Sequence, residues 1–246
     1  MNTVELMPGI VAVDLALFLK NENILVIGDV HLGYEDALRK QGVFMPRFQF
    51  KDTISRLEKI FLLLQPQLKN KKLEAVVVNG DLKHDFGSIS EQEWRDILKL
   101  LDFLLQHSEQ VILVKGNHDI KLAPIARKRG IVVVENIAIN DKFICHGHEV
   151  PVSSDFKKSK IVIVGNEHPA VSLRDSVRSE LYKCFLLGKW DGKKMVVMPS
   201  FNQITIGTDI LKEKFISPFM QQNLSRFEVF VVGDETYYFG KVKNVE

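Results

Sequence analysis

Residues 111–119 read VILVKGNHD, an apolar run that ends in glycine, asparagine, histidine and aspartate. A short apolar run that is rich in β-branched residues and bounded by a glycine is typical of a buried strand. After a single strand, such a polar cluster predicts only a turn or a helix cap. The same combination recurs along the chain, however, and its recurrence indicates both a fold and a site.

Five runs share this pattern and predict buried strands in the middle of the chain. They are ILVIG (24–28), AVVVNG (75–80), VILVKG (111–116), FICHG (143–147) and IVIVG (161–165). Helices are predicted over 48–65, where apolar residues recur every three or four positions, and over 90–106, which opens with the capping-box pair Ser90 and Glu93. Strands that alternate with helices in this way are typical of an α/β fold.

The last quarter of the chain has a different pattern. Residues 184–200, CFLLGKWDGKKMVVMPS, and residues 227–242, FEVFVVGDETYYFGKV, each place glycine and aspartate between two apolar runs. Such segments predict β-hairpins. We therefore expect β-rich segments at both ends of the chain, and two mixed sheets that pack face to face with helices outside them.

Length and composition indicate a globular protein with a sizeable core. The chain has 246 residues, of which 46% are hydrophobic and 26% charged, and it shows no low-complexity segment or repeat, so we expect one domain over residues 1–246. The net charge of +2, from 33 basic and 31 acidic residues, argues against a general polyanion binder but leaves room for a local basic groove. Cys145, on a predicted strand, is interpreted as a core residue.

The sequence also predicts a cytoplasmic protein that does not enter a membrane. The apolar stretch from Ile10 to Leu19 is interrupted by Asp14 and is too short to cross a bilayer. No basic segment precedes it, as a secretory signal would require. Two cysteines without a CxxC motif are typical of reduced thiols in a cytoplasm.

The histidines are concentrated where the predicted strands end. Six of the seven lie in the clusters GDVH (28–31), NGDLKHD (79–85), GNHD (116–119), HGHE (146–149) and GNEH (165–168). Sites of open α/β sheets lie beyond the carboxyl ends of the strands, so these side chains are expected to converge. One such cluster is ordinary, but five in one chain predict a functional site.

The side-chain types in these clusters indicate metal chemistry. Carboxylate, amide and imidazole ligands together suit borderline first-row ions such as Mn, Fe, Ni or Zn better than a thiolate zinc site or an all-oxygen Mg or Ca site. The candidate ligands are too numerous for one ion, which favours two ions bridged by a carboxylate. Two ions about 3.5–4 Å apart form the clamp that stabilises in-line displacement at phosphorus.

In order and position, these motifs resemble those of the calcineurin-like metallophosphoesterase superfamily. The resemblance covers residues 29–168, and the intact GNHD at 116–119 is its most specific part. The GDLKH and EHP variants, with MPSFN downstream, are most similar to the archaeal, DNA-ligase-associated branch related to the nuclease SbcD/Mre11. The resemblance implies a four-layer αββα sandwich, in agreement with the strand and hairpin pattern.

The resemblance further implies that the ligands divide between two divalent ions. Asp81 would bridge both ions. The other implied ligands are Asp29, His31 and His168 for the first ion, and Asn117, His146 and Asn166 for the second.

Other residues would handle the substrate. His118 would be the acid or the phosphate-orienting group near the leaving oxygen, and Asp119 would hold its imidazole. Arg47 could reach a substrate phosphate with its fork of donors, although a solvated arginine at a helix start is the alternative. His84 and His148 are further candidates for substrate contacts.

Two positions depart from the superfamily's pattern. His84 stands where the second motif usually has its second Asp, a residue that is normally not a direct ligand. Asn166 stands where the superfamily usually has a metal-binding histidine. An amide oxygen is a poorer ligand than imidazole for Zn or Ni but is acceptable to Mn. We therefore expect Asn166 to be a weak ligand and Mn to be the favoured metal, with Fe, Ni or Zn as alternatives. His148 could compensate, because it lies two residues from His146.

The resulting expectation is a phosphoesterase that cleaves a phosphodiester, in nucleic acid or a cyclic nucleotide. Hydroxide held between the two ions would attack phosphorus while His118 assists the leaving group. Within enzymes, the alternative is a phosphomonoesterase or small-nucleotide hydrolase. Outside enzymes, it is a non-catalytic partner subunit of a DNA-repair helicase or ligase, with Asn166 as the sign of a degraded site.

Overall fold

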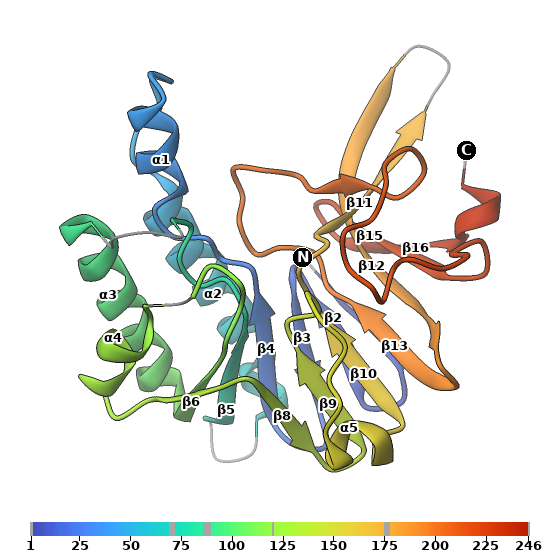
Figure 1. Ribbon diagram of the computed structural model, residues 1–246, viewed down its shortest axis with the longest axis horizontal. Coiled ribbons are helices and arrows are strands. Elements are labelled where there is room, and N and C mark those ends of the chain that lie inside the picture. The colour runs from blue at the N-terminus through green and yellow to red at the C-terminus, as the bar shows by residue number, and fades with distance from the viewer. Residues whose placement is uncertain (1, 69–71, 86–89, 120, 175–177, 246) are drawn as a thin grey trace.

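Two β-sheets packed face to face form the centre of the molecule (Figure 1). The computed structural model describes residues 2–68, 72–85, 90–119, 121–174 and 178–245. β4 runs antiparallel to β3 and parallel to β5, so the first sheet is mixed. Its seven strands, which are neighbours in chain order, are β1 (Thr3–Met7), β2 (Ile10–Val13), β3 (Ala16–Leu19), β4 (Ile24–Gly28), β5 (Leu73–Asn79), β6 (Ser108–Val114) and β7 (Val132–Val134).

The second sheet has nine strands and is also mixed. They are β8 (Asn136–Ile139), β9 (Lys142–Cys145), β10 (Ile161–Val164), β11 (Pro169–Arg174), β12 (Ser179–Trp190), β13 (Lys193–Val197), β14 (Thr208–Asp209), β15 (Glu228–Val232) and β16 (Thr236–Lys241). β10 lies between β9 and β13 and is parallel to both. The carboxyl ends of these three strands therefore lie at the same edge of the sheet.

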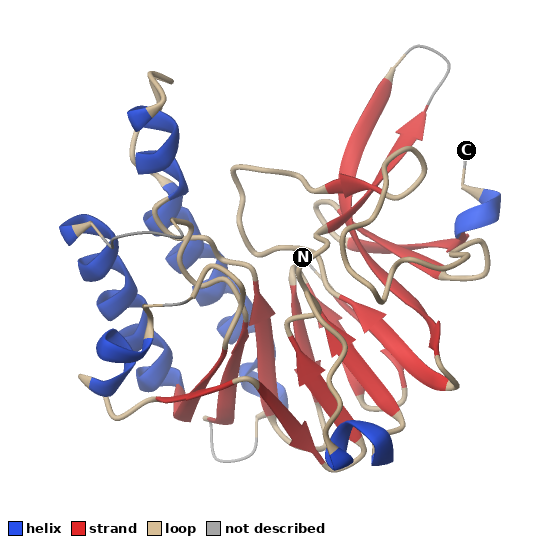
Figure 2. Ribbon diagram, in the orientation of Figure 1, coloured by secondary structure: helices blue, strands red, loops and turns tan. Residues whose placement is uncertain are grey.

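Helices cover mainly the outer face of the first sheet (Figure 2). The elements on this side are α1 (Tyr34–Lys40), α2 (Gln49–Leu64), η1 (Gln65–Gln67), α3 (Glu91–His107) and α4 (Ala123–Arg127). The second sheet carries the short α5 (Ser154–Lys158), whose Phe156 ring contacts Phe143 and Phe219, and η3 (Val242–Asn244) lies near the end of the chain. The outer layer of the second sheet thus contains little helix.

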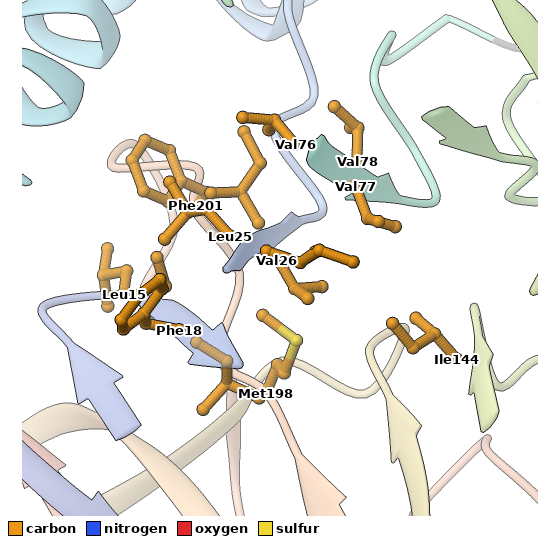
Figure 3. Close-up of a cluster of buried hydrophobic side chains, with 14 of the residues drawn as sticks. Leu15, Phe18, Leu25, Val26, Val76, Val77, Val78, Ile144, Met198 and Phe201 are labelled. Carbon is orange, nitrogen blue, oxygen red and sulfur yellow. The ribbon is translucent and has the colours of Figure 1, made fainter. Parts of the chain in front are cut away.

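Two apolar layers hold the sheets in place. The layer between the sheets takes side chains from both, among them Val26 of β4, Ile144 of β9 and Met198, which Figure 3 shows. A second cluster covers the outer face of the second sheet. Along β10, Ile163 belongs to the first cluster and Val162 to the second, because successive side chains of a strand point to opposite faces.

The expected α/β fold of two mixed sheets is confirmed. The five predicted central strands are β4, β5, β6, β9 and β10, and both predicted hairpins are present, as β12–β13 and β15–β16. The first hairpin turns at Asp191 and Gly192, whose φ angles of 46° and 77° suit the Asp–Gly sequence. Ser90 and Glu93 form the predicted capping box at the start of α3. Cys145 is buried in the core, as expected.

Among the described residues, no helix is long and apolar enough to cross a membrane.

Candidate metal centre

The five polar clusters meet where the two sheets come together. The clusters after β4, β5 and β6 come from the first sheet, and those after β9 and β10 come from the second. Two hydrogen bonds to Asp29 join the sheet edges: the Asn166 backbone N–H donates to Asp29 Oδ2 (3.2 Å), and the Asn202 backbone N–H donates to the Asp29 carbonyl (3.1 Å). The site therefore depends on the packing of both sheets.

Two groups of candidate ligands share Asp29. One contains Asp29, His31 and His168, and the other contains Asp29, Asp81 and His146; within each group the ligand atoms lie within 4.8 Å of one another. His168 Nε2 is 3.3 Å from Asp29 Oδ1, and His146 Nε2 is 3.0 Å from the same oxygen. His146 Nε2 also lies 3.5 Å from Asp81 Oδ2. The structure thus brings five of the seven candidate ligands into two adjoining groups.

Unpartnered polar atoms in this region fit a bound cation. Asn117 Oδ1 is buried and has no hydrogen-bond partner among the described residues, and the buried His168 Nε2 has only its 3.3 Å approach to Asp29 Oδ1. Leaving a buried polar atom without a partner is costly, so such atoms indicate a missing ligand. Carboxylate, amide and imidazole donors around one point are a set that first-row divalent ions accept. The residues present therefore fit a metal centre.

The backbone at the candidate ligands is unusual. Nine described non-glycine residues have positive φ angles, and five of these are candidate ligands. The five are Asp29 (54°), His31 (50°), Asp81 (42°), Asn166 (62°) and His168 (50°). Residues other than glycine adopt this left-handed region rarely, and clusters of them are characteristic of functional sites. At each strand end this conformation turns the chain sharply back toward the centre.

Glycines allow the ligands to approach the backbone closely. A Cβ at Gly116 would lie 2.1 Å from Asp81 Oδ1, and a Cβ at Gly80 would lie 2.1 Å from the His146 ring. Neither contact is sterically allowed. Gly80 also has a φ of 82°, which side-chain-bearing residues rarely adopt. The glycines of the GD and GNHD motifs therefore make room for the ligands themselves.

Burial and the charges of the cluster determine its protonation. Burial raises the pKa of Asp29, but the adjacent His168 and His146 outweigh it and hold that pKa well below its ordinary value. Burial raises the pKa of Asp81 above its ordinary value, and the Asp29 charge adds to the rise. Burial, followed by His168, lowers the pKa of His31 to about 2, so this imidazole is neutral and its lone pair is available to a metal. Two buried carboxylates with oxygens within 4.8 Å of one another favour added positive charge between them.

That Asp119 holds the imidazole of His118 stays a prediction, and the structure shows other partners for both groups. The Asp119 carboxylate accepts hydrogen bonds from the backbone N–H groups of Gly116 (3.0 Å) and Leu82 (3.1 Å). The ring nitrogen Nδ1 of His118 instead contacts the backbone carbonyl of His84. Asp119 thus joins the loops that follow β5 and β6. His118 is oriented by a carbonyl, which accepts a hydrogen bond from Nδ1.

Compensation for Asn166 by His148 stays a prediction. Nδ1 of His148 lies 3.0 Å from Nδ1 of His146, on the side of that ring away from Asp29. This is the position from which a neighbouring residue orients a metal-binding imidazole. Asn166 contacts Asp29 through its backbone N–H, and binding of a metal by its side chain stays a prediction.

The two remaining candidates lie in different places. The His84 ring is 5.4 Å from the His31 ring and 5.6 Å from the His118 ring, between centroids, so His84 lies at the centre. Arg47 is half-exposed and pairs with Asp36 at 3.0 Å. The described residues show no contact between Arg47 and the candidate ligands, because Asp36 engages its guanidinium.

Two polar residues next to the centre were not predicted from the sequence. The buried Gln49 of α2 donates through Nε2 to the backbone carbonyls of His31 (2.8 Å) and Val30 (3.2 Å). Lys183 of β12 donates to Ser200 Oγ (2.6 Å), and burial, followed by the charge of Arg56, lowers its pKa to about 7. A glutamine in a helix and a lysine in a strand carry no sequence signal of such roles.

One solved structure shows the same fold. A nuclease named MPE from Pseudomonas putida superposes with a TM-score of 0.67 at 17% identity, covering 97% of this chain and 99% of its own. A protein of unknown function, AQ665 from Aquifex aeolicus, gives a TM-score of 0.36 at 16% identity, covering 59% of this chain and 78% of its own. No curated protein sequence matches the chain.

The family model described as calcineurin-like phosphoesterase matches residues 22–192. This range contains all five polar clusters, from Asp29 to His168. It also contains the strands β4, β5, β6, β9 and β10, whose ends carry them. The chain belongs to the calcineurin-like phosphoesterase family.

Proposed function

We propose that the protein is a phosphodiesterase that uses two divalent metal ions, with Mn favoured, and acts on nucleic acid or a cyclic nucleotide. The observation that carries the proposal is the pair of ligand groups that share Asp29. Asp29, His31 and His168 would hold the first ion, Asp81 would bridge, and Asn117 and His146 would hold the second with Asn166. Two ions so held would polarise the phosphoryl oxygens and lower the pKa of the attacking water.

Within this proposal, His118 is the residue that exchanges a proton with the leaving oxygen. Its backbone N–H donates to Asp81 Oδ1 (2.9 Å), which fixes the residue against the centre. Its Nδ1 faces the His84 carbonyl, and its Nε2 lies 3.7 Å from Asp81 Oδ2. A proton would therefore be held on Nδ1, while Nε2 faces the reacting groups. A proton-transferring histidine of this kind contributes about 10²–10⁴-fold to rate.

Two observations favour a diester of nucleic acid within this proposal. The Pseudomonas putida protein of the same fold is named a nuclease. The variants GDLKH and EHP, with MPSFN, resemble the SbcD/Mre11-related, DNA-ligase-associated branch. MPSFN also belongs to the site, because the Phe201 backbone N–H donates to the Gly28 carbonyl at 2.8 Å and thereby supports the residue before Asp29.

Hydrolysis of chromogenic esters tests the proposal. Protein freed of metal with a chelator and reloaded with Mn should hydrolyse bis-p-nitrophenyl phosphate faster than p-nitrophenyl phosphate. Asp81→Asn should abolish this activity, whereas Asp191→Asn, in the exposed β12–β13 turn, should not. A preference for the monoester would instead establish a phosphomonoesterase.

The non-catalytic alternative makes the opposite prediction. A partner subunit of a DNA-repair helicase or ligase would bind at most one ion weakly and would hydrolyse no diester. An Asp81→Asn variant as active as the unmodified protein would remove the mechanism. Metal analysis after Mn loading, with a screen of diesters, cyclic nucleotides and single-stranded DNA, separates these outcomes.

A further inference from the structure

Three histidine rings form a third group beside the two that contain Asp29. Ring nitrogens of His31, His84 and His118 lie within 4.8 Å of one another. Their ring centroids are 5.1 Å apart for His31 and His118, and 5.4 Å apart for His31 and His84. This group contains no carboxylate, which distinguishes it from the other two.

The backbone fixes the three residues beside one another. The loops after β4 and β5 pair through a short parallel bridge between Leu32 and Lys83. Within it, the backbone N–H of His84 donates to the Leu32 carbonyl at 2.9 Å. The His84 carbonyl in turn contacts Nδ1 of His118. His84 therefore belongs to a connected framework and is not a surface histidine that happens to lie nearby.

Two of the rings present nitrogens without partners. Nδ1 of His31 and Nδ1 of His84 are buried and have no hydrogen-bond partner among the described residues. The His31 side chain is only 7% exposed, so water does not readily compensate for the missing hydrogen bond. An imidazole nitrogen buried in this way needs a cation or a donor, and the other ring nitrogens of this group lie within 4.8 Å of it.

We propose that His31, His84 and His118 form a third cation site, which takes a borderline ion such as Zn²⁺ and thereby inhibits the enzyme. Three imidazole nitrogens with one water are an established ligand set for zinc, at Zn–N distances of about 2.0–2.1 Å. Nitrogen-only ligands favour Zn over Mn, which prefers carboxylate and carbonyl oxygen. Rotation of the half-buried His84 and His118 rings would bring the nitrogens to these distances.

Occupation of this site would disable two functional residues together. His31 would be withdrawn from the group that contains Asp29 and His168, and His118 could no longer exchange a proton with the leaving oxygen. The inhibition rests on the proposed phosphodiesterase activity, whereas zinc binding does not. The two parts can therefore be tested separately.

The binding test uses the fact that Asp29 is common to the two other groups. Asp29→Asn should weaken both of those groups and leave the three histidines intact. We expect the Asp29→Asn protein to lose Mn binding, measured by electron paramagnetic resonance, and still to bind one Zn²⁺, measured by competition with a chromophoric chelator. Adding His84→Ala to this variant should weaken zinc binding by more than about tenfold, since even loss of a supporting residue costs about 10–100-fold.

A matched control is His107→Ala on the same Asp29→Asn background. His107 stacks on Phe61 at the end of α3, and its removal should leave zinc binding unchanged.

X-ray absorption of the zinc complex should show imidazole scattering that decreases when His84 is replaced. Equal zinc affinity with and without His84 would overturn the proposal, as would an Asp29→Asn protein that folds but binds no zinc. If Asp29→Asn does not fold, the unmodified protein saturated with Mn is compared with His84→Ala in the same zinc competition.

The inhibition test uses the full protein with Mn and the diester substrate. The zinc concentration that halves the rate should rise by more than about tenfold in His84→Ala, in line with the weaker binding. An unchanged zinc concentration would contradict the inhibitory role. A protein without any hydrolysis would contradict the proposed function instead, and the binding experiment would still decide whether the third site exists.

Discussion

At the scale of single residues, the centre is built from backbone conformations that most side chains avoid. Five candidate ligands have positive φ, and each comes directly after a strand or within four residues of its end. Such conformations cost of order 1–3 kcal/mol each and persist only where the surroundings enforce them. Here the strands that precede the turns, β4, β5 and β10, are held in register within the two sheets and support these conformations.

Gly116 shows how little space the centre leaves. Gly116→Ala should abolish Mn binding and lower the free energy of unfolding by about 1–3 kcal/mol, because the added methyl group overlaps the Asp81 carboxylate and overpacked sites carry costs of this size. Thermal unfolding and Mn titration measure the two effects. Gly233→Ala is the control, since a Cβ there would meet nothing closer than 3.8 Å. A Gly116→Ala protein with unchanged Mn affinity would contradict this account of the site.

His118 should affect catalysis without affecting metal content. His118→Asn keeps a polar side chain but removes the proton-exchanging ring, so we expect kcat for the diester to fall by about 10²–10⁴-fold. Mn stoichiometry should stay the same, because His118 lies outside the two ligand groups that contain Asp29. Single-turnover kinetics with metal analysis on the same sample measure both quantities. Loss of Mn together with activity would show that His118 is a ligand.

The sequence predicted which residues gather, but not how each one acts. Strand ends followed by Asp, Asn and His were sufficient to locate the centre, because parallel strands deliver their carboxyl ends to one edge. The roles of Asp119 and His148 could not be derived, since each depends on which of several nearby donors it meets. Gln49 was missed because its carbonyl partners are backbone groups, which leave no trace in a sequence pattern.

At the scale of elements, strands with a local sequence signal were predicted, and elements defined mainly by tertiary packing were not. The β12–β13 hairpin has its Asp–Gly turn in the sequence, and the five central strands have continuous apolar runs. β11 was not predicted, because its residues PAVSLR alternate too briefly and its neighbours β12 and β14 are set by tertiary packing. The short helix α5 likewise packs through a single buried residue, Phe156.

The start of α2 acts as a support for the metal-binding loop after β4. Glu35 accepts hydrogen bonds from the backbone N–H groups of Phe48 (2.8 Å) and Gln49 (2.7 Å), and Gln49 donates onward to the His31 carbonyl. An element without any ligand of its own therefore fixes the position of His31. Residues that support ligands in this way affect metal affinity almost as strongly as the ligands do.

Gln49→Met tests this support, because methionine has a similar length but no donor. The Val30 carbonyl would lose its partner and the His31 carbonyl would keep only the Tyr34 N–H, so we expect the free energy of unfolding to fall by about 1–3 kcal/mol and Mn affinity to fall by about 10–100-fold. Gln67→Met, at an exposed position of η1, is the control. Calorimetric Mn titration separates the two effects. A purely structural role for Gln49 would lower stability and leave the Mn affinity of the folded protein unchanged.

At the scale of the whole molecule, the centre lies between two sheets that meet mainly through apolar side chains, with the buried Glu22–Lys142 ion pair as a further polar link. Its carboxylates, Asp29 and Asp81, come from the first sheet, and His146 and His168 come from the second. Without cations, contacts such as His146 Nε2 to Asp29 Oδ1 (3.0 Å) are the polar links between them. A metal ion bound by both sets would join the two sheets directly.

Metal binding should therefore stabilise the entire fold and not only the loops. A ligand that binds only the native state, at a concentration of 100 times its Kd, raises the free energy of unfolding by about 2.7 kcal/mol. Each kcal/mol raises Tm by about 2–4 °C at this chain length, so saturating Mn should raise Tm by about 5–10 °C. Asp29→Asn should remove most of this shift because both ligand groups contain Asp29. Asp191→Asn, in the exposed β12–β13 turn, should retain it. Differential scanning calorimetry should show one transition that moves as a unit; a shift confined to a minor early transition would mean that the ions order the loops without joining the sheets.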